Sequence, residues 1–383
     1  MKTDPRDWNE HDRREFLKIA GASAFSAAMA TGLPIGAQET ETLKATVGIA
    51  KNPSIAKAVS QAVEMAGGMG FIKDGQRVLV KPNQVAPTKH PATTNPEVLY
   101  EVIKLAAQAG GDPIFLSDRC FQTYPDGEAV MKQTGHWDAA KQAELDLGGG
   151  VKVYPIEFHE AQEHLKPGSP IWRDIYHPLA KNYIEEDGTH SGFRLAELLF
   201  QVDHVINVPC CKVHNQAWFT MSMKAFVGMS DPATTRRYFH AKAGKGVHAV
   251  QGEGVNRYGG PFYMTEADSL PISRLIAELN LGLTPALNII DATRPIYAGG
   301  HIAGESKQAD VIIASTDRIA ADVTGISLLR TLGAEKRLHS MSPWKIPMIR
   351  HARKLRLGVN RREDLTVKHE GMDNIEELLE QMA

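Results

Sequence analysis

The sequence is poor in cysteine, in net charge and in long apolar runs. It has three cysteines among 383 residues, Cys120, Cys210 and Cys211, too few for a disulfide framework or a four-cysteine metal cluster. Its formal net charge is −2, so no overall basic field favours nucleic acid as a partner. Beyond the N-terminal segment no stretch approaches the length of about 18 apolar residues that a membrane-spanning helix needs. The sequence therefore predicts a soluble mature protein without a bound nucleic acid.

The sequence also lacks the motifs of several common enzyme classes. No G-x-G-x-x-G follows the first predicted strand, which removes the usual support for nicotinamide binding. The glycine-rich segment 244–260 does not match the P-loop pattern, and no G-x-S-x-G favours a serine hydrolase. His159 and His164 are five residues apart, so they diverge on a helix and do not form a zinc-protease pair.

The first 37 residues predict a twin-arginine signal peptide. The segment Arg13–Lys18 (RREFLK) resembles the twin-arginine export motif, and a moderately apolar run, 19–33, follows it. Small residues place the cleavage site after Ala30 or after Ala37. We therefore expect a periplasmic or otherwise exported protein, with the twin-arginine export machinery as a partner. The alternative is a chance Arg-Arg pair before an apolar helix.

Strands and helices alternate from residue 45 to residue 333. Short apolar runs predict strands at 45–50, 77–81, 113–117, 204–208, 286–290 and 311–315. Apolar residues at helical spacing predict helices at 54–66, 97–108, 128–145, 268–281 and 318–332. This alternation predicts one α/β domain with a mixed, mostly parallel sheet, helices on both faces and irregular insertions over the cleft.

The last segment, 334–383, is predicted to be a basic helical tail. Between Lys345 and Arg362 it holds seven lysines or arginines and no acidic residue, and an amphipathic helix is expected to begin near Pro347. Such a helix either packs on the domain with its charges in solvent or contacts an anionic lipid surface or an acidic partner protein.

The segment 204–229 (HVINVPCCKVHNQAWFTMSMKAFVGM) concentrates reactive side chains. A strand, 204–208, is expected to end at Pro209 and to be followed by a polar loop, 210–214, and then by a methionine-rich helix that carries Lys224. In an α/β sheet, ligands bind beyond the carboxyl ends of the strands. A loop at this position is therefore the expected site.

Charged side chains at other strand ends are predicted to share this site. Lys81, Asn83, Asp118 and His240 are candidate ligand-binding residues, and Asp291 and Asp317 also follow strands. Lys212 and His214 are two residues apart in an extended segment, so their side chains lie on one face. Lys212 and Lys224 would bind an anion, and His214 would transfer protons.

Structural roles remain as alternatives for each lysine. The alternative for Lys81 is an ion pair with a strand-end aspartate. The alternative for Lys212 and His214 is a solvated loop, and that for Lys224 is a lysine whose side chain extends from a core helix to solvent. Cys210 and Cys211, with Cys120, are weak candidates for zinc or iron, but adjacent cysteines do not easily reach one ion. Small buried apolar residues are their alternative role. The sequence leaves the cofactor unknown.

Several of these segments together resemble the family named domain of unknown function 362. The matching segments occur in family order: VLVKPN (78–83), TTNPEVLYEVIKLAAQAG (93–110), Ser117-Asp118, VINVPCCKVH (205–214), MKAFVGM (223–229), NIIDAT (288–293) and ASTDRIAADVTG (314–325). The resemblance implies that Lys81, Asn83, Lys212, His214, Lys224 and Asp322 occupy characteristic positions. Many family members carry a ferredoxin-like segment with clustered cysteines, which this chain lacks, so the resemblance implies no iron–sulfur cluster.

These observations lead to one preferred function and two alternatives. We expect an exported protein that binds a small anionic ligand among lysine and histidine side chains and acts as an enzyme of unknown reaction. A non-catalytic binding or accessory protein is the first alternative. A metal or redox protein that uses Cys210 and Cys211 is the second.

Overall fold

The computed structural model describes residues 43–120, 126–183, 188–235 and 266–383. The predicted signal peptide (1–37), His240 and the glycine-rich segment 244–260 lie outside these residues. Among the described residues no helix has the length and apolar character to cross a membrane.

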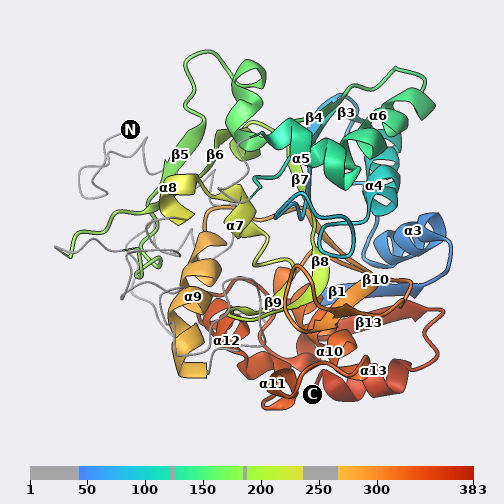
Figure 1. Ribbon diagram of the computed structural model, residues 1–383, viewed down its shortest axis with the longest axis vertical. Helices are drawn as coiled ribbons and strands as arrows, with labels where there is room; N and C mark the ends of the chain where they lie inside the picture. Colours follow the sequence, from blue (N-terminus) through green and yellow to red (C-terminus); the bar gives the residue numbers. More distant parts are fainter. Residues whose placement is uncertain (1–42, 121–125, 184–187, 236–265) are drawn as a thin grey trace.

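One large twisted sheet organises the molecule (Figure 1). Its main path runs in the order β13-β1-β12-β10-β7-β2-β3-β4, and β8, β9 and β11 pair beside it. These strands are β1 Ala45–Lys51, β2 Gln76–Pro82, β3 Gly111–Leu116, β4 Val153–Pro155, β7 His204–Val208, β8 Cys210–His214, β9 Trp218–Thr220, β10 Leu287–Ala298, β11 Glu305–Ser306, β12 Val311–Ser315 and β13 Leu365–Glu370. A separate antiparallel pair joins β5 Trp172–Ile175 to β6 Phe193–Ala196.

The predicted mixed, mostly parallel sheet is confirmed. On the main path every neighbouring pair is parallel except the two pairs that β12 makes, with β10 and with β1. The strands β2, β3, β7 and β10 therefore end at the same edge of the sheet, whereas β12 ends at the opposite edge. This difference decides which strand-end residues come together.

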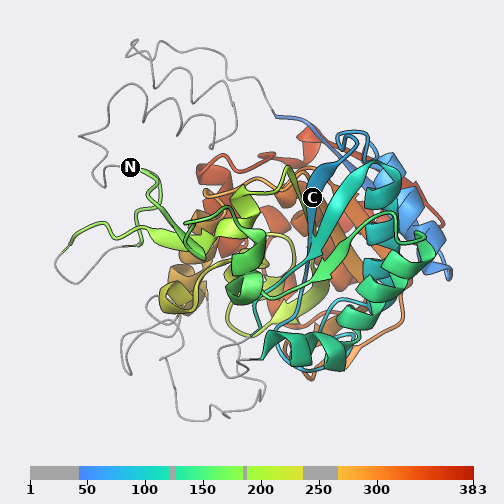
Figure 2. The same ribbon diagram turned by 90° about the horizontal axis from the view of Figure 1, so that it is seen from above.

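Helices cover both faces of the sheet (Figure 2). The apolar side chains of α3 and α4 pack on one face, and those of α9, α10 and α12 pack on the other. The α-helices are α3 Ile55–Met65, α4 Pro96–Gln108, α5 Gly127–Thr134, α6 His136–Asp146, α7 Phe226–Met229, α8 Pro232–Thr234, α9 Glu266–Leu279, α10 Arg318–Thr331, α11 Lys336–His339, α12 Pro347–Lys354 and α13 Ile375–Gln381. Short 3-10 turns are η2 Phe158–His164, η3 Glu197–Phe200, η5 Pro343–Lys345 and η6 Arg362–Asp364.

Local sequence explains the elements that lead to the candidate site. In β2, Val78 and Val80 contribute to the core beneath α3 and α4, and Leu79 contributes to the core on the other face, because successive strand side chains alternate. The helix α4 begins one residue before the predicted start: the Asn95 side chain accepts a hydrogen bond from the Glu97 amide, and Pro96 occupies the first turn.

Two predicted boundaries were wrong. The single helix expected at 128–145 is two helices, α5 and α6, because Gly135 between them adopts φ 85°, a left-handed conformation that ends a helix. The basic tail also contains a strand that the sequence did not predict: β13 pairs in parallel with β1. The helix expected near Pro347 is confirmed as α12, and its residues Met348, Ile349 and Ala352 are buried against the domain.

The segment 210–229 also differs from the prediction. Residues 210–214 form the buried strand β8, which pairs with β10 and with β9, and not a polar loop. The expected methionine-rich helix is instead the strand β9, a turn that carries Lys224, and the four-residue helix α7. A short run that is buried on all sides has no polar face, so its periodicity does not separate helix from strand.

A buried lysine cluster as candidate functional site

Lys81 and Asp118 form a buried ion pair at the ends of β2 and β3. Lys81 Nζ lies 2.8 Å from Asp118 Oδ1, with side-chain exposures of 1% and 3%. Lys81 also donates to the Pro82 carbonyl, and Asp118 accepts from the backbone amides of Gln84 and Arg119. Burial lowers the pKa of Lys81 and raises that of Asp118, and the pairing opposes both shifts. The amide donors of Gln84 and Arg119 stabilise the charged form of Asp118.

The helix α7 approaches this ion pair through Gly228. A Cβ atom at position 228 would lie 2.2 Å from Asp118 Oδ1 and 3.1 Å from Lys81 Nζ. Glycine is therefore the residue that lets the backbone of α7 lie directly on the pair. The sequence reading did not single out Gly228, although it lies within the segment 223–229 that resembles the family.

Lys212 lies on β8, beside the ion pair, and none of its hydrogen bonds within the described residues goes to a carboxylate. Its Nζ donates to Asn83 Oδ1 at 3.1 Å and to the Ala92 carbonyl, and its side chain is buried. The connection from β2 to α4 supplies both acceptors. That connection is fixed at Thr94, whose hydroxyl accepts from the Asn83 amide and donates to the Val208 carbonyl.

Lys224 completes the cluster from the turn after β9. The ammonium makes no hydrogen bond or ion pair within the part of the chain that the structure describes, and the residue is part-exposed. Burial and the positive charges of Lys212 and Lys81 lower the pKa of Lys224 to about 7. Lys224 therefore loses its proton far more readily than an ordinary lysine.

Three buried side chains hold the backbone that precedes Lys224. Asp322 on α10 accepts from the amides of Ser222 (2.7 Å) and Met223 (3.0 Å). Asn207 on β7 donates to the Ser222 carbonyl, and Asn280 donates to the Met223 carbonyl, each at 3.0 Å. All four backbone groups of these two residues are thus bound, so the turn that carries Lys224 is rigidly placed.

One buried hydroxyl near the lysines, that of Thr220, has no hydrogen-bond partner among the described residues. Thr220 lies directly across the β8–β9 pair from Lys212, so the two side chains share a face. The Ser222 hydroxyl, two residues before Lys224, interacts with the Asp322 carboxylate. A buried hydroxyl without a protein partner is costly, so the Thr220 hydroxyl is available to a bound polar group.

His214 lies on the same face of β8 as Lys212, as predicted, but at the far end of the strand. Its Nδ1 accepts hydrogen bonds from the amides of Gln216 and Ala217, each at 3.2 Å. The neutral ring therefore carries its proton on Nε2. The ring stacks on His301, with centroids 4.1 Å apart.

The three cysteines have different neighbours. The Cys210 thiol lies 3.9 Å from the Thr94 hydroxyl, whereas the Cys211 thiol donates to the Gly325 carbonyl on the opposite face of β8. Burial raises the pKa of all three thiols, to about 12 for Cys210. Among the described residues no group of three or more His, Cys, Asp or Glu side chains is arranged to hold a metal ion.

The two remaining aspartates that were predicted to follow strands differ. The prediction for Asp291 was wrong in its strand boundary, because β10 continues to Ala298 and Asp291 lies within it, opposite Cys210 of β8. Its carboxylate accepts from the Asn95 amide and lies 3.5 Å from His90. The expectation that Asp317 shares this site was wrong, because β12 runs antiparallel to its neighbours. Asp317 caps α10 at the other edge and accepts from the Val359 amide.

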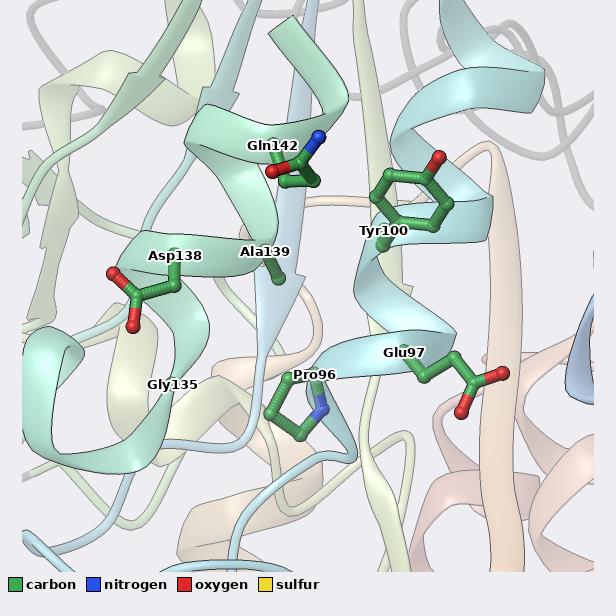
Figure 3. Close-up of a pocket in the computed structure, with 7 residues that line it drawn as sticks. All are labelled: Pro96, Glu97, Tyr100, Gly135, Asp138, Ala139 and Gln142. Atoms are coloured by element: carbon green, nitrogen blue, oxygen red, sulfur yellow. The ribbon is translucent and has the colours of Figure 1, made fainter. Parts of the chain in front are cut away.

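The described surface has a shallow groove that is separate from the cluster (Figure 3). It lies between α4 and α6 and is lined by Pro96, Glu97 and Tyr100 on one side and by Asp138 and Gln142 on the other. None of the candidate residues named from the sequence lines it. The lysine cluster therefore remains the stronger candidate, because it combines charge, burial and unpaired polar groups.

Comparison with known proteins identifies the family. The model named "Domain of unknown function (DUF362)" matches residues 78–327, more than half of the chain. The chain belongs to the DUF362 family. The chain is also 25% identical, over 295 residues, to the "Thylakoid-associated protein sll1697" of Synechocystis sp.. The aligned region covers 74% of this chain and 75% of that protein.

The DUF362 match covers every lysine of the cluster and the residues that hold them. Lys81, Asn83, Lys212, Lys224 and Asp322 all lie within residues 78–327, and the fold brings their segments together. The sequence reading missed Asn207, Asn280 and Gly228. Only Asn207 left a usable signal, because a polar amide in the centre of an apolar strand predicts a buried hydrogen bond.

Proposed function

We propose that this DUF362 protein binds a small anionic ligand, a carboxylate or a phosphate, at Lys212 and Lys224. The observation that carries the proposal is the balance of charge in the cluster. Three lysine side chains lie near one another, and two carboxylates act on them: Asp118, which is paired with Lys81, and Asp291, which lies close enough to influence Lys212 but accepts hydrogen bonds from Asn95 and Thr293. Burying cationic groups without counter-charges is costly, so an anion that binds between them recovers part of that cost.

The neighbouring groups fit such a ligand. The Thr220 hydroxyl, on the face of Lys212, supplies a neutral donor for a ligand oxygen atom. The turn before Lys224 is held by buried side chains, so little conformational entropy is lost when the ligand binds. The preferred function is therefore an enzyme for a small anionic substrate, with His214 as proton donor and acceptor through Nε2.

Anion binding is tested by titration calorimetry with phosphate and with oxalate. Replacing Lys212 by methionine is expected to weaken binding by about 10–100-fold, since a hydrogen bond to a charged group contributes about 1.5–3 kcal/mol. The matched control is Lys57→Met, at an exposed position of α3, which should leave the affinity unchanged. Equal affinities of the Lys212 variant and the wild type would refute this placement of the site.

We extend the proposal to export and to an accessory role. The segment Arg13–Lys18 favours export by the twin-arginine route, and the Synechocystis relative is named as a thylakoid-associated protein. Cell fractionation is expected to find the wild-type chain outside the cytoplasm and the Arg13→Lys, Arg14→Lys variant inside it. The same location for both would exclude this route. A protein that binds anions but converts none of a broad set of substrates would favour the accessory role over the enzyme.

A further inference from the structure

We propose that Lys224 forms an imine with the carbonyl carbon of a 2-oxo carboxylate whose carboxylate group is bound by Lys212. The inference rests on the proposed anion site and names its substrate class. It assigns different tasks to the two lysines: Lys212 is the fixed cation, and Lys224 is the nucleophile. The geometry of the cluster supports this division in three steps.

The first step is the contrast between the hydrogen bonds of the two lysines. Lys212 is fully buried and donates to Asn83 and Ala92, so its ammonium is held in one place. Lys224 is part-exposed, and within the described residues its amine is not engaged by any acceptor. A nucleophile needs a lone pair that no hydrogen bond or ion pair occupies, and Lys224 meets this condition.

The second step is the placement of Lys224. Asp322, Asn207 and Asn280 bind the four backbone groups of Ser222 and Met223 with distances of 2.7–3.0 Å. Asn280 is itself fixed, since its side-chain oxygen accepts from the buried Arg318 guanidinium. A solvated surface lysine needs no such support. Three buried polar side chains directed at one turn are typical of a residue whose position matters for function.

The third step is the charge state of the amine. Lys81 and Lys212 repel a proton on Lys224, and burial acts in the same direction, so its pKa falls to about 7. An amine next to other cationic groups is more easily deprotonated, which is one way in which enzymes activate a lysine for imine formation. A bound carboxylate on Lys212 would also place the adjacent carbonyl carbon of a 2-oxo acid near the cluster.

The chemistry balances without an oxidant or a reductant. The lone pair on Lys224 Nζ attacks the carbonyl carbon, a C–N bond forms, and the π-electron pair of the carbonyl moves to oxygen, which takes up a proton. The nitrogen, which is positively charged after the attack, gives up one proton, so the product is a neutral carbinolamine. Its hydroxyl group is protonated and leaves as water while the nitrogen lone pair forms the C=N bond; the protonated imine that results can return this proton to solvent. One water is released for each imine, and hydrolysis reverses the step.

The test is reductive trapping on the full-length protein. The protein is incubated at pH 7 with pyruvate, 2-oxoglutarate or phenylpyruvate and treated with sodium borohydride, which reduces an imine to a stable secondary amine. Peptide mass spectrometry is expected to find one adduct on Lys224 and a missed tryptic cleavage there. Acetone, which has the carbonyl group without the carboxylate, should give at least tenfold less adduct.

The variants separate this inference from the anion site. Lys224→Arg should remove the adduct, and Lys57→Arg should keep it. Asp322→Asn, which disturbs the support of the turn and not the amine, should reduce the adduct yield while the protein remains folded. If calorimetry detects binding of the 2-oxo acids but none gives an adduct on Lys224, the imine is refuted and the anion site stands. If none of the three binds and none is trapped, the inference is also refuted, and binding of phosphate and oxalate then decides the anion site alone.

Discussion

Replacing Asp118 by alanine is expected to lower the free energy of unfolding by about 3–5 kcal/mol, the usual cost of removing one partner from a buried ion pair. Lys81 would keep only the Pro82 carbonyl as a recorded acceptor at a position that is nearly inaccessible to water. The backbone amides of Gln84 and Arg119 would lose their acceptor as well. Urea unfolding followed by circular dichroism measures the change.

Two further variants make this result specific to the ion pair. Asp74→Ala removes an exposed aspartate and should change the stability by less than about 0.5 kcal/mol. The double variant Lys81→Met, Asp118→Asn removes both charges and should be more stable than Asp118→Ala, because no unpaired charge stays buried. A double variant that is less stable than the single one would show that the pair is not the cause.

The amine of Lys224 is expected to titrate about three pH units below an ordinary lysine, since burial and the charges of Lys212 and Lys81 lower its pKa from 10.5 to about 7. Its acylation rate by acetic anhydride, followed by peptide mass spectrometry, should reach half of its maximum near pH 7. A rate that rises only above pH 9 would contradict the lowered pKa. Lys212→Met should move the midpoint upward, because it removes one of the repelling charges.

The same shift predicts how stability depends on pH. Between about pH 7 and about pH 10.5 the unfolded chain binds a proton at Lys224 that the folded chain has lost. Stability contributed by this group therefore rises as the pH increases through that window. Other groups titrate in the same range, so the measurement is the difference between the wild type and Lys224→Met. A difference that is constant from pH 7 to pH 10 would contradict the linkage.

Local rules of sequence predicted several elements of the fold correctly. The strands β1, β2, β7 and β12 and the helix α4 formed where short apolar runs and apolar residues at helical spacing indicated them. These features depend on a few neighbouring residues. The break at Gly135 and the pairing of β13 with β1 were missed, because a left-handed glycine and a partner more than 300 residues away are not visible in a local window.

At the candidate site, too, the sequence predicted which residues are present but not how they are arranged. The sequence named Lys81, Asn83, Asp118, Lys212, His214 and Lys224 from strand ends and from resemblance to the family. It could not tell that Lys81 pairs with Asp118 and that Asp317 lies at the opposite edge, because both depend on strand direction. Gly228 and Asn280 became visible only when α7 and the end of α9 were placed against the cluster.

The sequence by itself determined the α/β class, the family and the residue types at the site, since composition, periodicity and motif order are properties of the chain. Only the tertiary structure decided that 210–214 is a buried strand and that Lys224 lies on a supported turn. It also decided that Lys81 has a carboxylate partner and that the amine of Lys224 has no acceptor among the described residues. The physical reason is that charge state depends on burial and on neighbouring charges, and folding brings those neighbours from residues far apart in the chain.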